Sequence, residues 1–254
     1  MNSRQMTQDI SYASSAKSRR GRAMIRLVEN MTGRIGLIRR AQGFHREMAE
    51  GRDFWRVIPD RYGICLDVIG GSLDNIPRSG PLVLVANHPY GILDGLMMGH
   101  ILSGLRRDFR IVAHGVFRRA EILNRVILPI SSDEAKEAVR LNLETRARAL
   151  DYLGQGGAIG IFPGGTVSTG ATPLAPALDP VWRNFTAKMI ARSDATVVPL
   201  FFDGQNSRLF QIASHLNYTL RMALLIKEFR ARVDEPVRIV VGRPIPQAEL
   251  AARR

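Results

Sequence analysis

A histidine and an aspartate lie six residues apart where an apolar segment runs into a turn. The segment Leu82–Ala86 has the character of a buried strand, Asn87 and His88 follow it, and Asp94 falls near the start of the next expected helix. Ligands of α/β sheets bind at the carboxyl ends of strands. A carboxylate can hold one imidazole nitrogen while the other takes a proton from a substrate, so the pair predicts a general base. A structural interpretation stays open, in which His88 caps the strand and Asp94 caps the helix.

A second apolar segment ends in a glycine-rich loop. Residues 156–168 contain the run Phe162-Pro163-Gly164-Gly165-Thr166 directly after a strand-like segment. Free backbone N–H groups in such a loop can bind an oxyanion or a phosphate. A tight turn with positive φ explains the two glycines equally well.

A third strand-like segment, 196–202, is followed by polar residues. Asp203, Asn206 and Arg208 come directly after it. These groups suit a polar headgroup. Alternatively, Asn206 simply caps the next helix.

The sequence lacks the motifs of several other kinds of enzyme. It contains neither a Gly-x-Ser-x-Gly elbow nor a Walker loop, and the glycines at 154, 156 and 160 lack dinucleotide-loop spacing. The other four histidines show no metal-ligand spacing, and Cys65 lies in an apolar segment as an expected small hydrophobe. We therefore expect neither a metal nor a cofactor.

The elements that position these residues alternate along the chain. Expected strands cover 64–69, 82–86, 110–114, 126–130, 158–162, 196–202 and 237–241, and expected helices cover 94–104, 134–153, 183–193, 206–214 and 217–230. Residues 164–180 read as a loop. This alternation predicts a single layered α/β domain with a largely parallel central sheet flanked by helices. The helix at 134–153 has Ser131 and Glu134 in capping-box spacing, and its expected apolar face consists of Val139, Leu143, Ala147, Leu150 and Leu153.

The chain of 254 residues is strongly basic, with a formal net charge of +13. Such a surface favours phosphate-bearing or otherwise anionic partners. Ten basic and two acidic residues fall within 1–46. We therefore divide the chain into an N-terminal basic amphipathic helical arm, 1–50, and a domain, 51–254.

The arm has an apolar stripe at helical spacing beside its arginines. The stripe consists of Met24, Leu27, Val28, Met31, Ile35 and Ile38. A helix lying in a lipid headgroup layer has this pattern, and so does a helix packed on its own domain; Gly33 and Gly36 weaken either helix. Nucleic-acid binding is a third, weaker interpretation, since no reader motif accompanies the charge. Without a signal peptide or an uninterrupted apolar span, the expected location is cytoplasmic, peripheral on the inner face of the cell membrane.

The order of the three segments resembles the glycerolipid (lysophospholipid) acyltransferase superfamily, which includes lysophosphatidic acid acyltransferases. The resemblance rests on Asn87-His88 with Asp94, then Phe162–Thr166, then Val198-Pro199, and it covers about residues 62–245. It implies that His88 is the base, that Asp94 orients it and that the second motif positions the acceptor. It also implies an acyl thioester of acyl-carrier protein or coenzyme A as co-substrate, without a covalent acyl-enzyme.

Two departures from the family pattern narrow this resemblance. Five residues rather than four separate His88 from Asp94, as in an Asn-His-Pro-x-Gly variant found in some bacterial members, where Gly91 absorbs the extra residue. Gly164 and Val167 stand where the family has Glu and Arg, and that Arg is the family's candidate for gripping the acceptor phosphate. Either other arginines replace it, or the acceptor is a lyso-aminolipid such as lyso-ornithine lipid. The substrate-binding candidates are Asn87, Gly91, Phe162, Pro163, Gly164, Gly165, Thr166, Arg118, Arg119 and Arg208.

The sequence therefore predicts a membrane-associated O-acyltransferase of lipid biosynthesis. The acceptor is a lysolipid of the lysophosphatidate type, with a lyso-aminolipid as the alternative. A lipid hydrolase using the same pair on water is the rival enzyme. A non-catalytic basic protein that binds membrane or nucleic acid is the rival of another class.

Overall fold

The structure is a computed structural model, and it describes residues 11–16, 18–115, 121–131, 135–182 and 184–252. The strands are β1 (Cys65–Gly70), β2 (Leu82–Ala86), β3 (Arg110–His114), β4 (Ile127–Ile130), β5 (Ala158–Ile161), β6 (Thr169–Gly170), β7 (Ala177–Leu178), β8 (Thr196–Phe202) and β9 (Pro236–Val241). The helices are η1 (Ala13–Ser15), α2 (Arg19–Thr32), α3 (Arg34–Ala41), α4 (Phe44–Ala49), α5 (Phe54–Tyr62), η2 (Leu73–Asn75), α6 (Ile92–Leu105), α7 (Glu121–Asn124), α8 (Lys136–Gly154), α9 (Asn184–Ala191), α10 (Arg208–Leu216), α11 (Tyr218–Arg230) and α12 (Gln247–Ala251).

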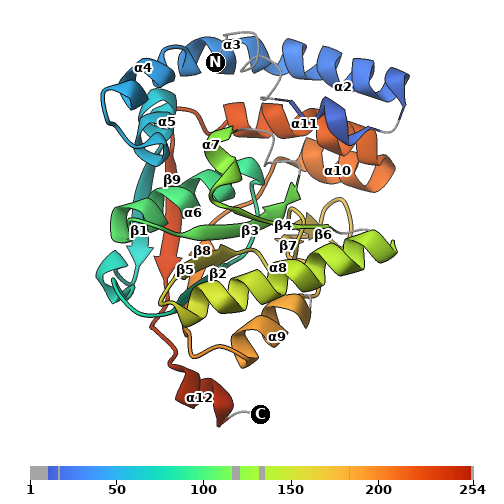
Figure 1. Cartoon of the computed structure of the whole chain (residues 1–254). Coiled ribbons are helices and arrows are strands. Elements are labelled where there is room, and N and C mark those ends of the chain that lie inside the picture. Colours follow the sequence, from blue (N-terminus) through green and yellow to red (C-terminus); the bar gives the residue numbers. More distant parts are fainter. Residues whose placement is uncertain (1–10, 17, 116–120, 132–134, 183, 253–254) are drawn as a thin grey trace.

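Seven strands form one sheet in the order β1-β9-β8-β2-β5-β3-β4 (Figure 1). All neighbouring pairs are parallel except β8 and β9, which are antiparallel. The predicted α/β fold with a largely parallel sheet is therefore confirmed. β2 lies between β8 and β5, so its carboxyl end, where His88 follows, is at the middle of the sheet edge.

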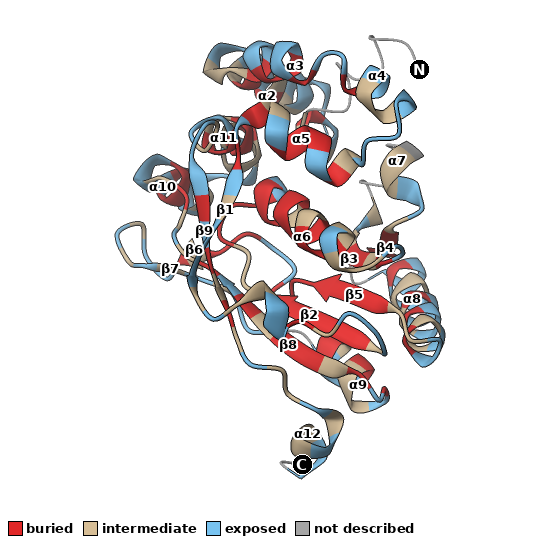
Figure 2. Cartoon of the chain, turned by 90° about the vertical axis from the view of Figure 1, so that its left-hand side faces the viewer, coloured by how far each residue is buried: buried red, intermediate tan, exposed pale blue. Residues whose placement is uncertain are grey.

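The strand sequences alternate between two hydrophobic cores, one on each face of the sheet. In β2, Leu82 and Leu84 belong to the core beneath α5 and α6, whereas Val83 and Val85 belong to the core beneath α8 and α9. This is the two-residue period of a strand buried on both sides. Figure 2 shows β2 and β5 as buried throughout, and β8 and α6 as buried over much of their length.

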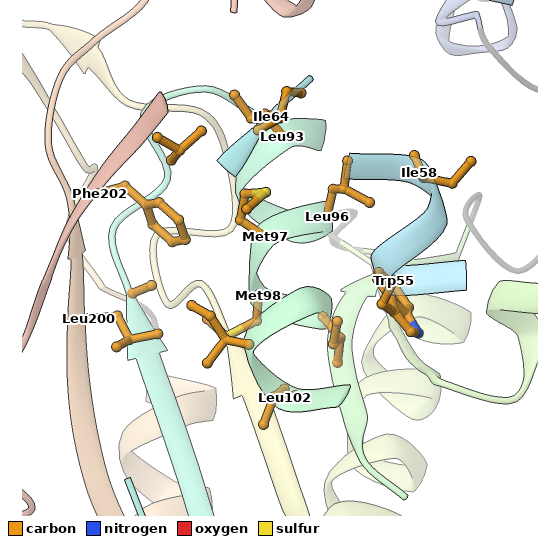
Figure 3. Packing of buried hydrophobic residues seen from close by; sticks show 14 of the residues in the cluster. Trp55, Ile58, Ile64, Leu93, Leu96, Met97, Met98, Leu102, Leu200 and Phe202 are labelled. Atoms are coloured by element: carbon orange, nitrogen blue, oxygen red, sulfur yellow. The ribbon is translucent and has the colours of Figure 1, made fainter. Parts of the chain in front are cut away.

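Helix α6 packs closely between the sheet and α5, and this packing fixes the position of its first turn. Figure 3 shows Met97 and Met98 directed toward the side of Phe202 in β8, while Trp55 packs on the other side of the helix. A Cβ at Gly99 would stand 2.0 Å from the Trp55 ring, so only glycine permits this approach. Because α6 is held along its length, the residues of its first turn have little freedom to move.

The arm predicted for residues 1–50 forms helices α2, α3 and α4 within the described part of the chain. α2 ends at Gly33, whose φ of 122° breaks the helix there. α2 packs on α11 (Figure 1) through Ile25, which shares a buried cluster with Ala223. The buried carboxylate of Glu29 accepts hydrogen bonds from the Ser11 hydroxyl and the Tyr12 N–H, and so ties α2 to the segment before it.

The predicted apolar stripe lies mostly on the other side of these helices. Met24, Leu27, Met31 and Ile35 are 41%, 60%, 76% and 47% exposed. α2 therefore does pack on its own domain, through Ile25, but these four residues of the stripe take no part in that packing. Among the described residues, no helix is long and apolar enough to cross a membrane.

Other expectations about helix and strand faces need correction. α8 begins at Lys136 after Ala135, with no side-chain cap, and Glu134 of the predicted capping box lies outside the described residues. Val139 and Leu143 are about half exposed, because the buried positions of α8 are Ala138, Thr145, Ala149 and Leu153.

The expectation that Cys65 acts as a small hydrophobe within an apolar strand is also wrong. Cys65 is exposed, because β1 is an edge strand with most of its residues in solvent. The expected loop 164–180 contains the short hairpin of β6 and β7. α10 starts after Ser207, whose hydroxyl accepts from the Phe210 N–H, so Asn206 is not its cap.

Candidate active site

His88 and Asp94 lie against each other at the junction of β2 and α6. His88 Nδ1 is 2.9 Å from Asp94 Oδ2. The Asp94 side chain is fully buried and that of His88 is 18% exposed. With Nδ1 facing the carboxylate, Nε2 is the nitrogen free to meet a substrate. The ring N–H is not directed along the short contact, so it is an electrostatic contact rather than a linear hydrogen bond.

Asp94 contacts both His88 and the backbone of the turn, so its geometry fits the structural and the catalytic interpretation alike. Its Oδ2 also accepts hydrogen bonds from the backbone N–H groups of Tyr90 and Gly91, at 2.8 and 2.9 Å. Burial raises the pKa of the Asp94 carboxyl, while His88 and these two N–H groups pull the pKa down in part. A carboxylate held this way in a dry environment stabilises an imidazolium that forms beside it.

The turn from 87 to 91 accounts for the longer spacing between the pair. Gly91 adopts φ 84° and ψ −120°, a conformation that residues with a Cβ avoid. This conformation returns the chain so that the N–H of Gly91 reaches Asp94. At the other end of the turn, the Asn87 amide donates to the Phe202 carbonyl and accepts from the Phe202 N–H. Asn87 thus ties β2 to β8, and both polar atoms of its amide are engaged.

The glycine-rich loop lies directly beside His88. The Phe162 ring stacks on the imidazole with ring centroids 4.4 Å apart, and the Ser168 N–H donates to the His88 carbonyl at 2.8 Å. The Gly165 N–H closes a turn on the Phe162 carbonyl, so it is not available to an oxyanion. Among the described residues, the N–H groups of Gly164 and Thr166 find no acceptor, which leaves these two as candidate oxyanion donors.

Asp179 joins the two loops, although nothing in the sequence indicated it. Its Oδ1 accepts from the His88 N–H at 3.0 Å and from the Ser168 hydroxyl, and its Oδ2 accepts from the Trp182 indole N–H. Oδ2 also lies 3.3 Å from the place where a Cβ at Gly164 would stand. A carboxylate from a distant loop therefore occupies space beside the motif position where the family has Glu.

Of the three arginines singled out from the sequence, the structure describes Arg208. Arg118 and Arg119 lie outside the described residues. Arg208 donates to the carbonyls of Leu174 and Ala175, so it braces the turn between β6 and β7.

A different arginine, Arg221 of α11, reaches the glycine-rich loop. It donates to Thr169 Oγ1 at 2.6 Å, to the Val167 carbonyl at 2.7 Å and to Thr166 Oγ1 at 3.3 Å. The sequence carries no local signal for Arg221, because this residue lies within an ordinary amphipathic helix, more than fifty residues beyond the loop.

The structure also has a cleft that lies away from His88 and Asp94. A cleft of about 780 Å³ lies beside Trp55, Arg56, Arg107 and Phe109. It is at the far end of α6 from Asp94, about 15 Å along the helix axis from Asp94 to Ser103 and Arg106. In the part of the chain that the structure describes, no three His, Cys, Asp or Glu side chains group as metal ligands.

The fold and the site define an α/β protein with an imidazole–carboxylate pair at the carboxyl end of a central strand, the arrangement of a general-base enzyme. The sequence pattern of the acyltransferase family matches residues 37–254, and the chain belongs to this family. The predicted membership of an acyltransferase family is thereby confirmed.

Two bacterial relatives are similar in sequence. Both are called lyso-glycine lipid O-acyltransferase. The one from Phocaeicola vulgatus is 24% identical over 182 residues, 69% of this chain and 63% of the relative. The one from Bacteroides thetaiotaomicron is 24% identical over 186 residues, 69% of this chain and 64% of the relative. The chain thus spans less than two thirds of the length of these relatives.

One solved structure also aligns with the chain. The 1-acyl-sn-glycerophosphate (LPA) acyltransferase PlsC from Thermotoga maritima does so with a TM-score of 0.47 and 15% identity, covering 93% of this chain and 75% of that protein.

Proposed function

We propose that this protein transfers an acyl chain from a thioester to the hydroxyl of a lysolipid with an amino-acid headgroup. The observation that carries the proposal is the contact between His88 and the buried Asp94 in a chain of the acyltransferase family. The lyso-glycine lipid acceptors in the names of the two relatives favour the amino-acid headgroup over a phosphate. Gly164 and Val167, in place of the Glu and Arg of the phosphate-binding pattern, favour it as well.

In this mechanism the acceptor hydroxyl lies against Nε2 of His88. His88 takes the hydroxyl proton as the oxygen attacks the thioester carbonyl, and Asp94 stabilises the imidazolium that forms. Base assistance of this kind contributes roughly 10²–10⁴ in rate. The N–H groups of Gly164 and Thr166 stabilise the negative charge on the carbonyl oxygen, a contribution of about 3–4 kcal/mol. The C–S bond then breaks, and the leaving thiolate takes the proton back from His88.

The donor is acyl-carrier protein or coenzyme A carrying the acyl group. Both are anionic and suit a chain with a net charge of +13. A thioester is already activated, so the transfer needs no metal or nucleotide.

The exposed stripe of α2 and α3 suits the surface of an anionic membrane, from which the acceptor would be taken. Met24, Leu27, Met31 and Ile35 lie in solvent, and arginines flank them. An apolar stripe beside basic residues is the pattern of helices that lie in a headgroup layer. The exposed basic residues of this region include Arg19, Arg20, Arg22 and Arg39.

The test is transfer by the purified protein from labelled acyl-carrier protein or coenzyme A thioesters. Lyso-glycine lipid, lyso-ornithine lipid and lysophosphatidate serve as parallel acceptors, and mass spectrometry detects the products. We expect label in the diacyl form of an amino-acid lipid. Label in the lysophosphatidate product alone would favour the phosphate acceptor instead. Label released as free fatty acid without any acceptor would indicate a hydrolase, and no turnover with any donor would leave a non-catalytic membrane-binding protein.

A further inference from the structure

Arg221 places a positive charge on the outer side of the glycine-rich loop. Its two terminal nitrogens donate to the Thr169 hydroxyl, the Val167 carbonyl and the Thr166 hydroxyl, and its guanidinium lies over the Phe210 ring at 5.2 Å. These contacts fix the plane of the guanidinium. The contact with Thr166 lies at the surface, so a ligand can reach this edge of the group.

Arg221 has no carboxylate partner in the part of the chain that the structure describes. Within the described residues, no carboxylate lies within 4.0 Å of its guanidinium. Burial lowers its pKa, which shows that the surroundings disfavour the charged form. A partly desolvated cation without an anion is costly. An anionic ligand would remove this cost and gain a charge-assisted, forked hydrogen bond.

A single peptide group, between Val167 and Ser168, connects Arg221 to the backbone of His88 by hydrogen bonds. The carbonyl of Val167 accepts from Arg221, and the N–H of the same peptide, on Ser168, donates to the His88 carbonyl. By ordinary peptide dimensions, the guanidinium and the His88 carbonyl lie within about 8 Å of each other. This separation is on the scale of a small headgroup.

The packing of Val167 explains why the cation comes from another element. The Val167 side chain is 8% exposed and belongs to an apolar cluster with Phe210 and Leu225. A charged side chain at 167 that kept this direction would enter the apolar cluster. Arg221 instead approaches the loop backbone from α11, on the side that Thr166 shares with solvent.

We propose that Arg221 and the hydroxyl of Thr166 form a subsite for the anionic oxygens of the acceptor headgroup. In the amino-acid lipids of the proposed function, on which this assignment rests, the anion is the carboxylate that remains when an amino acid is acylated on its amine. A lysolipid phosphate presents the same kind of oxygen.

Equilibrium binding tests the subsite without requiring turnover. The probes are N-dodecanoylglycine, its uncharged amide and dodecanoyl lysophosphatidate, each below its critical micelle concentration. The proteins are the wild type, Arg221→Gln, Arg221→Lys and the control Arg148→Gln, which removes an exposed arginine from α8 on the other face of the sheet. We expect the wild type and the control to bind the carboxylate about tenfold to a hundredfold more tightly than the amide. Arg221→Gln loses this preference, and Arg221→Lys retains part of it.

Other outcomes distinguish a ligand-binding role of Arg221 from a purely structural one. They also distinguish failure of the subsite from failure of the proposed function. A preference that persists in Arg221→Gln, or an equal loss for carboxylate and amide, overturns the subsite. Tighter, Arg221-dependent binding of lysophosphatidate supports the subsite but makes its anion a phosphate. Arg221-dependent binding in a protein that transfers no acyl group supports the subsite while the proposed function fails. Where transfer occurs, Arg221→Gln raises the acceptor KM about tenfold or more and leaves kcat within about threefold.

Discussion

Replacing Asp94 by Asn removes a charge from the site while keeping its shape. In the wild type, Oδ2 of Asp94 lies 2.9 Å from His88 Nδ1 and accepts the N–H groups of Tyr90 and Gly91. An amide oxygen can still accept these hydrogen bonds. What disappears is the attraction between the carboxylate and the imidazolium formed as the hydroxyl is deprotonated.

The size of that loss follows from the geometry of the pair. For charge centres about 4 Å apart at an effective dielectric constant near 20, the attraction is about 4 kcal/mol. The Asp94→Asn variant is therefore expected to lose about 10³-fold in kcat. The acceptor KM changes little, because the carboxylate does not contact the acceptor.

The assay is steady-state acyl transfer followed by mass spectrometry, with thermal unfolding measured in parallel. In Asp94→Asn, the new amide N–H₂ group takes the place of Oδ1, which accepts no hydrogen bond among the described residues. An unpaired amide costs about 1–3 kcal/mol, so Tm falls by only several degrees. Asp151→Asn, on the exposed side of α8, is the control and keeps full activity. A folded Asp94→Asn protein with kcat within threefold of the wild type would refute the reasoning.

Three further predictions concern the turn, the joining carboxylate and the exposed stripe. Gly91→Ala lowers the unfolding free energy in urea by about 1–3 kcal/mol, because its φ of 84° strains any residue with a Cβ; an unchanged midpoint would contradict this. Asp179→Asn lowers kcat about tenfold with an unchanged acceptor KM, because His88 loses a charged backbone acceptor; unaltered kcat would make the contact irrelevant to catalysis. The double variant Leu27→Gln/Met31→Gln reduces sedimentation with anionic vesicles about tenfold or more, because both side chains are exposed and apolar. Equal binding by the variant and the wild type would contradict a role of the stripe in membrane binding. The matched controls are Gly95→Ala, Asp151→Asn and the pair Val139→Gln/Leu143→Gln, which is also exposed and has the same spacing of four residues.

The parallel core of the sheet was predictable because its strands are buried on both faces. Leu82–Ala86 and Thr196–Phe202 are nearly uninterrupted apolar runs, and their observed bounds are those expected. The approach of His88 to Asp94 was foreseeable for a related reason. Both residues belong to one strand–turn–helix unit, in which local geometry sets their separation.

Features that depend on distant elements were not predictable from local patterns. The buried face of α8 is set by what β4, β5 and α9 offer it, so Val139 and Leu143 face solvent although their spacing fits an apolar stripe. Asp179 and Arg221 reach the site from segments 91 and 133 residues beyond His88. Their chemistry appears only when the fold brings the hairpin and α11 to the glycine-rich loop.

The most direct measurement is the rate of diacyl lipid formation by purified His88→Ala protein under single-turnover conditions. The wild type is expected to convert a labelled acyl thioester and a lyso-amino-acid lipid to the diacyl product. The His88→Ala protein, with an unchanged circular dichroism spectrum and unchanged vesicle binding, is expected to be at least about 10³-fold slower. A rate equal to that of the wild type would contradict the assignment of His88 as the base.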